Sequence, residues 1–195
     1  NPAVRAQSVK ELVALAGKPG ARFAYASPGA GSPIQLAGSM FAARAGVDMV
    51  HVAYKGAGPA ITALLGGEVQ VMFVTPPLSI QHIQAGRLRV LAYTGSTRAS
   101  FLPTVPTMGE AGIPAMQLDA MSWYGMFAPA GTPPGIVAKL QRETRAAVHQ
   151  PQVAGRLRAL HLEPAGSTPA EFAAFMDDQL KRFAEMVKLA GFEPE

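Results

Sequence analysis

A strand, a glycine-rich turn and a helix start follow one another in residues 23–36, and this order constrains the fold more than any other feature of the chain. Gly29 and Gly31 allow the backbone to turn tightly with its N–H groups facing outward. Ser32, with Gln35 three residues later, makes a capping-box pattern that predicts the start of a helix. Outward N–H groups and the positive end of a helix dipole together favour binding of an anion.

The same order recurs along the first half of the chain. Short runs rich in Val, Phe and Tyr predict strands at residues 23–26, 49–54, 69–74 and 88–93. Helices are predicted at residues 9–16, after Ser32 as far as Gly46, after Pro59 as far as Gly66, and at residues 78–85. Such alternation indicates βαβ units and a mostly parallel sheet, so the predicted class is α/β.

Four loops follow the carboxyl ends of the predicted strands, and all are rich in Gly, Pro, Ser or Thr. They are residues 27–32, 55–59, 75–77 and 94–96. In open α/β sheets ligands bind at this edge. We therefore assign residues 8–113 to a ligand-binding α/β domain.

The pattern changes in residues 114–195. One long strand or two are predicted within residues 116–128, followed by a helix after Thr132, a short helix at 152–160 and a long one opened by the capping box Thr168–Glu171. This part alone has too few elements to cover its apolar faces. We interpret it as half of a domain whose partner strands lie elsewhere.

The composition of the chain excludes several classes of function. The net charge of +4 comes from scattered Lys and Arg without a basic stripe, so we expect no nucleic-acid partner. The absence of Cys excludes disulfides and thiolate catalysis. No apolar run approaches the roughly 20 residues of a membrane helix, and no signal peptide is visible. The four His residues show neither metal-ligand spacing nor a partnered nucleophile, so no cofactor or metal is expected.

Six segments occur in an order that is specific to one known family. They are residues 25–32, 50–56, 64–67, 122–125, 127–133 and 166–172. Together they resemble the Bug family, also called TctC-like proteins, the extracytoplasmic solute receptors of tripartite tricarboxylate transporters. The resemblance covers essentially the whole chain.

The resemblance implies a fold and a function. It implies a periplasmic-binding-protein type II-like fold, with two α/β domains joined by crossing strands. It also implies that backbone groups and ordered waters hold a small carboxylate in the cleft between the domains. The receptor would lie in the periplasm and deliver its ligand to a membrane permease of a small and a large subunit, without itself being inserted in the membrane.

The resemblance further implies that the first domain is incomplete in this chain. Family members begin with a signal peptide and a first-domain segment whose Pro-Gly-Gly turn supplies half of the carboxylate site. By this resemblance, Asn1 corresponds to a position just after the first hinge strand of the family. Residues 8–113 are therefore interpreted as the second domain, and residues 114–195 as the hinge return and the C-terminal part of the first.

Candidate ligand-binding residues lie on the loops at the predicted sheet edge. They are Ser27, Gly29, Ala30, Gly31, Ser32, Gln35, Tyr54, Lys55, Gly56 and Thr75. Two positions depart from the family pattern: Gln35 stands where His is usual, and Val74-Thr75 stands where Asp or Asn is common. Trp123 and Tyr124 are assigned to core or hinge packing.

Two other functions remain open at this stage. One is an enzyme on an α/β scaffold that acts on a small anionic substrate. Against it, the sequence has no P-loop Lys, no Gly-x-Ser-x-Gly motif and no base near Ser27. The other is a ligand sensor that passes its bound state to a membrane signalling protein.

Overall fold

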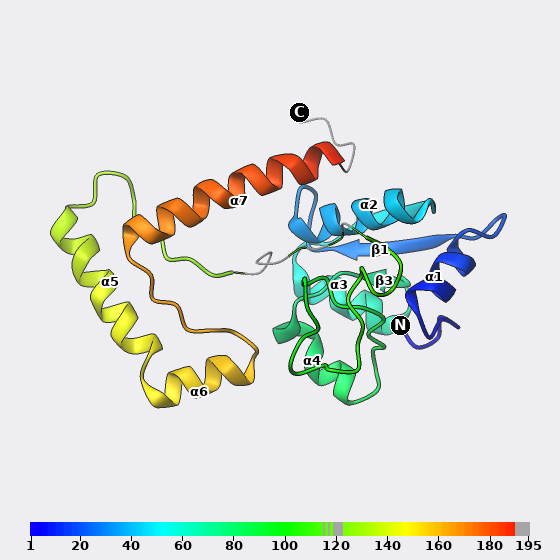
Figure 1. Cartoon of the computed structure of the whole chain (residues 1–195), viewed down its shortest axis with the longest axis horizontal. Coiled ribbons are helices and arrows are strands. Elements are labelled where there is room, and N and C mark those ends of the chain that lie inside the picture. The colour runs from blue at the N-terminus through cyan, green and yellow to red at the C-terminus, as the bar shows by residue number, and fades with distance from the viewer. Residues whose placement is uncertain (115, 117, 119–122, 190–195) are drawn as a thin grey trace. The chain divides into compact units, whose positions relative to one another are not determined.

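The structure, a computed structural model, describes residues 1–114, 116, 118 and 123–189. It contains two compact units (Figure 1). Unit 1 consists of Asn1–Met121 and Met186–Glu195, and unit 2 consists of Ser122–Glu185.

Unit 1 contains a parallel sheet of strands β1 (Phe23–Ser27), β2 (Met49–Ala53) and β3 (Val71–Met72), in the order β2-β1-β3. The register places Tyr25 of β1 beside His51 of β2 on one side and Val71 of β3 on the other. The predicted α/β class with a parallel sheet is confirmed.

Helices are found in unit 1 near the four predicted positions, but the third begins at Ala57 instead of after Pro59 and the fourth at Pro76 instead of at residue 78. They are α1 (Val9–Ala16), α2 (Pro33–Ala45), α3 (Ala57–Gly66) and α4 (Pro76–Gln84). The Ser32 hydroxyl accepts a hydrogen bond from the Gln35 N–H at 3.3 Å, which caps the amino end of α2. Gly46 and Gly67 end α2 and α3 with φ values of 63° and 83°, a left-handed conformation that costs glycine little.

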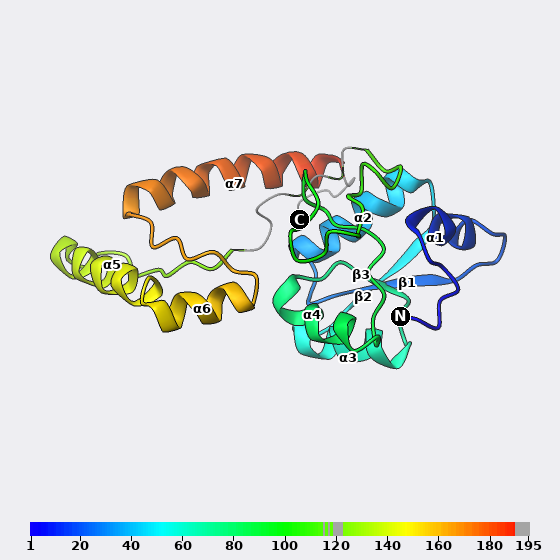
Figure 2. The same ribbon diagram turned by 60° about the horizontal axis from the view of Figure 1, so that its bottom comes forward.

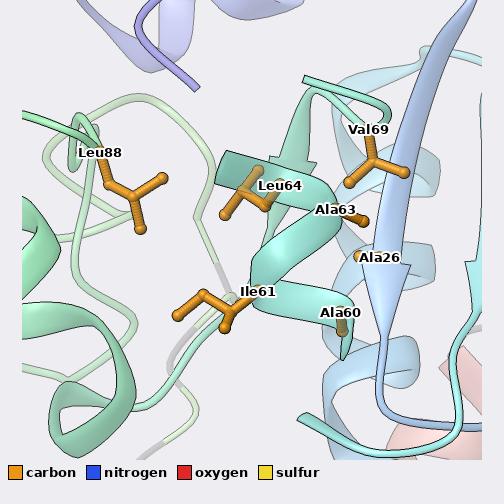
Figure 3. Close-up of a cluster of buried hydrophobic side chains, with 7 residues drawn as sticks. All are labelled: Ala26, Ala60, Ile61, Ala63, Leu64, Val69 and Leu88. Atoms are coloured by element: carbon orange, nitrogen blue, oxygen red, sulfur yellow. The ribbon is translucent and has the colours of Figure 1, made fainter. Parts of the chain in front are cut away.

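The two faces of β1 contact different helices, and Figure 2 shows α2 and α3 on opposite sides of the strands. Tyr25 points toward α2, where its hydroxyl lies 2.7 Å from the Ser39 hydroxyl and its ring leaves no room for a side chain at Gly38. Ala26 points the other way, toward Ala60 and Ala63 of α3 (Figure 3). The complete cluster of buried residues on that side is Ala26, Ala60, Ile61, Ala63, Leu64, Val69 and Leu88.

The strand predicted at residues 88–93 is wrong. Tyr93 makes an isolated bridge to Thr107: its N–H donates to the Pro106 carbonyl at 2.8 Å, and its carbonyl accepts from the Met108 N–H at 2.9 Å. The apolar pattern there reflects burial instead, since Leu88 packs against α3. Strand β3 is also shorter than the predicted 69–74, although the Gln70 N–H still donates to the Ala24 carbonyl at 3.1 Å.

Unit 2 contains α5 (Pro134–Val148), α6 (Pro151–Ala159) and most of α7 (Pro169–Leu189). The capping box at the start of α7 is confirmed: the Thr168 hydroxyl accepts from the Glu171 N–H at 3.2 Å, and the Glu171 carboxylate accepts from the Thr168 N–H at 2.8 Å. No strand is found in residues 123–128. The rest of the strand prediction for residues 116–128 falls partly on residues outside the described ranges.

Aromatic side chains form the packed centre of unit 2. The Trp123 ring lies 5.7 Å from that of Phe172 and 5.6 Å from that of Phe175, and a side chain at Gly125 would collide with Phe172. Packing of Trp123 is therefore confirmed. The same prediction for Tyr124 is wrong, because Tyr124 is 75% exposed.

Candidate functional site

The carboxyl ends of the three strands form the candidate site. Strand β1 lies in the middle of the sheet, with β2 on one side and β3 on the other. The order in which the strands are added therefore changes direction beside β1. Open α/β sheets bind ligands at such a switch point. Helices α2, α3 and α4 each begin after one of these strands, and their positive dipole ends therefore meet at the same edge.

The turn between β1 and α2 is largely hydrogen-bonded within itself. The Gly31 N–H, at a left-handed φ of 72°, donates to the Gln35 side-chain oxygen at 2.6 Å. The Ser32 N–H donates to the Gly29 carbonyl at 3.4 Å. The N–H of Ala30, an exposed residue, has no acceptor among the residues that the structure describes. Ala30 therefore presents a free donor at the tip of the turn.

Gln35 stabilises the turn through two hydrogen bonds, of which the capping-box pattern predicted only the one to Ser32. Its backbone N–H is bound by Ser32, and its side-chain oxygen reaches one residue further back than the usual partner, to Gly31. The side chain is only 7% exposed. Gln35 therefore already occupies one of the amides predicted to bind a ligand.

The turn between β2 and α3 lies directly against the first turn. The Tyr54 N–H donates to the Ser27 carbonyl at 2.9 Å, and the Gly56 N–H donates to the Pro28 carbonyl at 3.0 Å. These bonds hold the residues on either side of Lys55, whose own side chain is exposed. The structure therefore brings the 27–32 and 54–56 parts of the predicted site together.

Tyr54 and Thr75 contribute differently from the turn amides. The Tyr54 ring packs against the buried cluster around α3, and burial, followed by the neighbouring Glu68 carboxylate, raises the pKa of its phenol. Thr75 lies before α4, where its carbonyl accepts from the Leu78 N–H and from the Ser79 hydroxyl, both at 3.1 Å. Its side chain makes no capping bond, so the hydroxyl is not committed to the helix.

His51 is the residue at this edge that sequence reasoning missed. Its Nε2 lies 2.7 Å from the hydroxyl oxygen of Ser27, a contact that the spacing of the His residues in the sequence does not reveal. The two residues are 24 positions apart and meet only because the parallel register sets His51 beside Tyr25, diagonal to Ser27. A strand register is not readable from one sequence, and no local signal marks this pair.

The chemistry of this edge suits non-covalent binding. Ser27 has no exposed surface, so its hydroxyl cannot reach a substrate as a nucleophile despite its His partner. Burial lowers the pKa of His51, which favours the neutral ring at pH 7. Over the described ranges, no group of three or more His, Asp or Glu side chains is placed to hold a metal ion. Among the helices of the described residues, none is long and apolar enough to cross a membrane.

Comparison with known sequences identifies relatives along the whole chain. A family model described as the tripartite tricarboxylate transporter family receptor, TctC, matches residues 1–192. A UPF0065 protein from the tcbD-tcbE intergenic region of Pseudomonas sp. strain P51 is 34% identical over 184 residues, which are 94% of this chain and 54% of that protein. BugT of Bordetella pertussis is 34% identical over 191 residues, 98% of this chain and 58% of its own. The chain thus spans about half the length of the curated relatives it matches.

Solved structures agree with the predicted fold. Rpa4515 of R. palustris, solved with adipate, superposes with a TM-score of 0.90 at 30% identity over 98% of this chain and 64% of its own. The periplasmic binding protein BugD gives 0.89 at 31% identity, with the same shares of 98% and 64%. MatC of Rhodopseudomonas palustris, with bound malate, gives 0.85 at 29% identity over 93% of this chain and 62% of its own.

These comparisons confirm both the predicted periplasmic-binding-protein fold and the resemblance found in the six segments. The family is described as a transporter receptor and BugD as a periplasmic binding protein, so neither description is that of an enzyme. The chain belongs to the TctC family of tripartite tricarboxylate transporter receptors.

Proposed function

We propose that this chain carries the ligand-binding edge of a periplasmic receptor that captures a small organic carboxylate. The observation that carries the proposal is the meeting of three helix amino ends with two interlocked glycine turns at one sheet edge. Partial positive charge collects there, and the turns offer backbone donors. The receptor would deliver its ligand to a membrane permease of a small and a large subunit, and the match to a receptor of tripartite tricarboxylate transporters supports such a partner.

The neighbours' ligands support a dicarboxylate. Rpa4515 was solved with adipate and MatC with malate, which are both small dicarboxylates. One carboxylate group of such a ligand would be bound at this edge. The other group would be bound by a part of the protein that faces it, as in a receptor that closes around its ligand.

Each candidate residue has a role in this proposal. Residues Ser27, Gly29, Ala30, Gly31 and Ser32 shape the turn and present its amides. A ligand oxygen would bind the free Ala30 N–H and would replace the Gln35 oxygen at Gly31, since a charged acceptor makes a stronger hydrogen bond than a neutral one.

The second turn and β3 would complete this edge. Lys55 would attract the anion from solution, while Tyr54 and Gly56 hold Lys55 beside the first turn. The Thr75 hydroxyl would add a donor from the β3 side. These assignments rest on position and on chemistry, and the following variants test them.

The decisive experiment measures binding of malate and adipate by calorimetry, with a protein of the length of its relatives. The diamide of adipic acid serves as a neutral ligand of similar shape. We expect both dicarboxylates to bind and the diamide not to bind. A panel of dicarboxylates without any binding would contradict the proposed function.

A pair of glycine variants tests the turn. Gly31 and Gly20 have φ values of 72° and 77°, and a Cβ at either position would meet nothing within 4 Å. Gly31→Ala and Gly20→Ala therefore carry a similar backbone strain of about 1 kcal/mol. We expect Gly31→Ala to weaken malate binding about tenfold or more, and Gly20→Ala to leave it unchanged. Equal effects of the two variants would remove the turn from the site.

A pair of lysine variants tests whether the positive charge of Lys55 contributes to ligand binding. Lys55 and Lys18 are both exposed, but only Lys55 lies at the proposed edge. We expect Lys55→Gln to weaken binding about two- to fivefold, because exposed ion pairs contribute little. The loss should shrink as salt is added. Lys18→Gln should bind like the parent, and a loss in both variants would indicate a general effect of net charge.

A further inference from the structure

The buried Ser27 hydroxyl makes three close polar contacts. Its oxygen lies 2.9 Å from the Gly29 carbonyl oxygen, 3.2 Å from the Gly29 nitrogen and 2.7 Å from His51 Nε2. A hydroxyl has one hydrogen to donate and two lone pairs that accept. Three partners therefore use its whole capacity.

The chemistry of the partners determines the direction of each bond. The Gly29 carbonyl only accepts, so it takes the Ser27 hydrogen, and the Gly29 N–H only donates, so it uses one lone pair. The remaining lone pair needs a donor, which requires a hydrogen on His51 Nε2. If Ser27 donated to His51 instead, two acceptor oxygens would face each other at 2.9 Å without a hydrogen between them.

We propose that His51 is a positioning residue for the turn between β1 and α2. Its Nε2–H fixes the Ser27 hydroxyl in the one orientation that binds both the N–H and the carbonyl of Gly29. The turn is thereby held in the shape that presents the Ala30 N–H. The proposal rests on the proposed function only in treating this turn as part of the ligand site.

His51 is itself held in place from the far side. Its ring lies 5.1 Å from the Tyr25 ring, with 32° between the planes. Tyr25 is 2% exposed and is fixed by Ser39 and by close contact with Gly38 of α2. A continuous series of contacts therefore runs from α2 through Tyr25 and His51 to the turn that precedes α2.

The position of the ring hydrogen of His51 is open only in the neutral imidazole, because the imidazolium has a hydrogen on both nitrogens. Burial lowers the pKa of His51 and favours the neutral form. A neutral imidazole has two tautomers, and only the one protonated at Nε2 completes the set of bonds at Ser27. The imidazolium also carries this hydrogen, so the bond does not depend on which of the two charge states is present.

The first test is spectroscopic and uses the ligand-free chain without any substitution. Nitrogen-15 NMR of the His51 ring distinguishes the two tautomers at a pH where the ring is neutral. We expect the hydrogen on Nε2. A hydrogen on Nδ1 alone would overturn the proposal, and this test does not depend on how any variant folds.

The second test compares amide hydrogen exchange in two variants. His51→Phe keeps a ring against Tyr25 but removes the donor, whereas His51→Gln keeps an N–H near the position of Nε2. We expect the Gly29 amide to exchange about fivefold faster in His51→Phe, the size of one net hydrogen bond, and within about twofold of the parent in His51→Gln. The Gln70 amide, which donates to Ala24 in the same sheet, is the internal control.

The outcomes separate a positioning role from general packing. Faster exchange at Gly29 with unchanged Gln70, restored by His51→Gln, supports the proposal. Equal acceleration at both amides, or parent-like exchange of Gly29 in His51→Phe, overturns it. Neither test uses a carboxylate ligand. Failure of the unsubstituted protein to bind malate would therefore count against the proposed function and not against this role of His51.

Discussion

Helices in unit 1 and unit 2 start from similar local signals but differ in what they bury. In unit 1, α1 buries Leu12, α2 buries Leu36 and Phe41, and α3 buries Leu64. In unit 2, α5 buries no residue and α6 buries only Ala154. The difference does not come from the quality of the helix ends, because α3 buries Leu64 although, like α5 and α6, it has no side-chain hydrogen bond at its amino end.

Large apolar side chains of unit 2 lie in solvent instead. Tyr124, Met126 and Phe127 are 75%, 64% and 67% exposed, and Ile136 and Leu140 of α5 are 51% and 44% exposed. A cap involves residues within one helical turn, whereas burial needs a partner surface that is distant in sequence. Unit 1 contains its own sheet as that partner, and the described part of unit 2 contains only helices and the segment around Trp123.

The largest expected effect comes from truncating equivalent leucines in the two units. Leu64 is 4% exposed within the cluster of α3, and Leu140 of α5 is 44% exposed. We expect Leu64→Ala to lower the free energy of unfolding of unit 1 by about 3 kcal/mol, through lost burial and a cavity. Leu140→Ala should change stability by less than about 0.5 kcal/mol.

Separate probes follow the two units in this experiment. Trp123 is the single Trp of the chain, so its fluorescence reports on unit 2 during urea unfolding. Exchange of the Gln70 amide reports on the sheet of unit 1. If Leu140→Ala cost as much as Leu64→Ala, the contrast between the two units would be broken.

A second pair of variants adds a methyl group instead of removing side chains. Gly38 of α2 faces the fixed ring of Tyr25 without space for a Cβ, whereas Gly155 of α6 has nothing within 4 Å. We expect Gly38→Ala to destabilise the protein by about 2 kcal/mol through overpacking. Gly155→Ala should stabilise it by about 0.5–1 kcal/mol, since Ala has the higher helix propensity. Thermal unfolding measures both, and destabilisation by Gly155→Ala would show that unit 2 is packed more tightly there.

The smallest effect concerns one capping carboxylate in each unit. Hydrogen bonds from Arg98 and then from the Thr107 N–H lower the pKa of Glu110, and bonds from the Thr168 N–H and hydroxyl lower the pKa of Glu171. Because the pKa of each carboxylate is lower folded than unfolded, its stabilisation is present above the ordinary value of about 4.3 and is lost as the pH falls through the lowered value.

Glutamine variants isolate these two contributions. Glu110→Gln and Glu171→Gln should each reduce the pH dependence of unfolding below about pH 5, measured by urea denaturation at a series of pH values. The reduction should be larger for Glu110, which also faces Arg98 at 2.8 Å. A larger reduction for Glu171 would reverse this ranking of the two units.

Sequence patterns alone predicted what depends on neighbours along the chain. The caps at Ser32 and Thr168 mark helix starts, and Gly46 and Gly66 mark helix ends, where the patterns placed them. The parallel sheet, the glycine turns and the family were predicted in the same way. Each of these features depends on groups within a few residues or on motifs in a characteristic order, so one sequence contains the information.

Only the tertiary structure decided which distant groups meet. The Ser27–His51 contact depends on the register of β1 and β2, and the Tyr54 ring packs on α3 although its backbone lies at the candidate site. Residues 88–93 have the composition of a strand, but Tyr93 bonds to the loop at residues 106–108. Tyr124 lies in solvent while the adjacent Trp123 packs on Phe172. Register, strand pairing and burial depend on partners many residues away, and local pattern does not specify those partners.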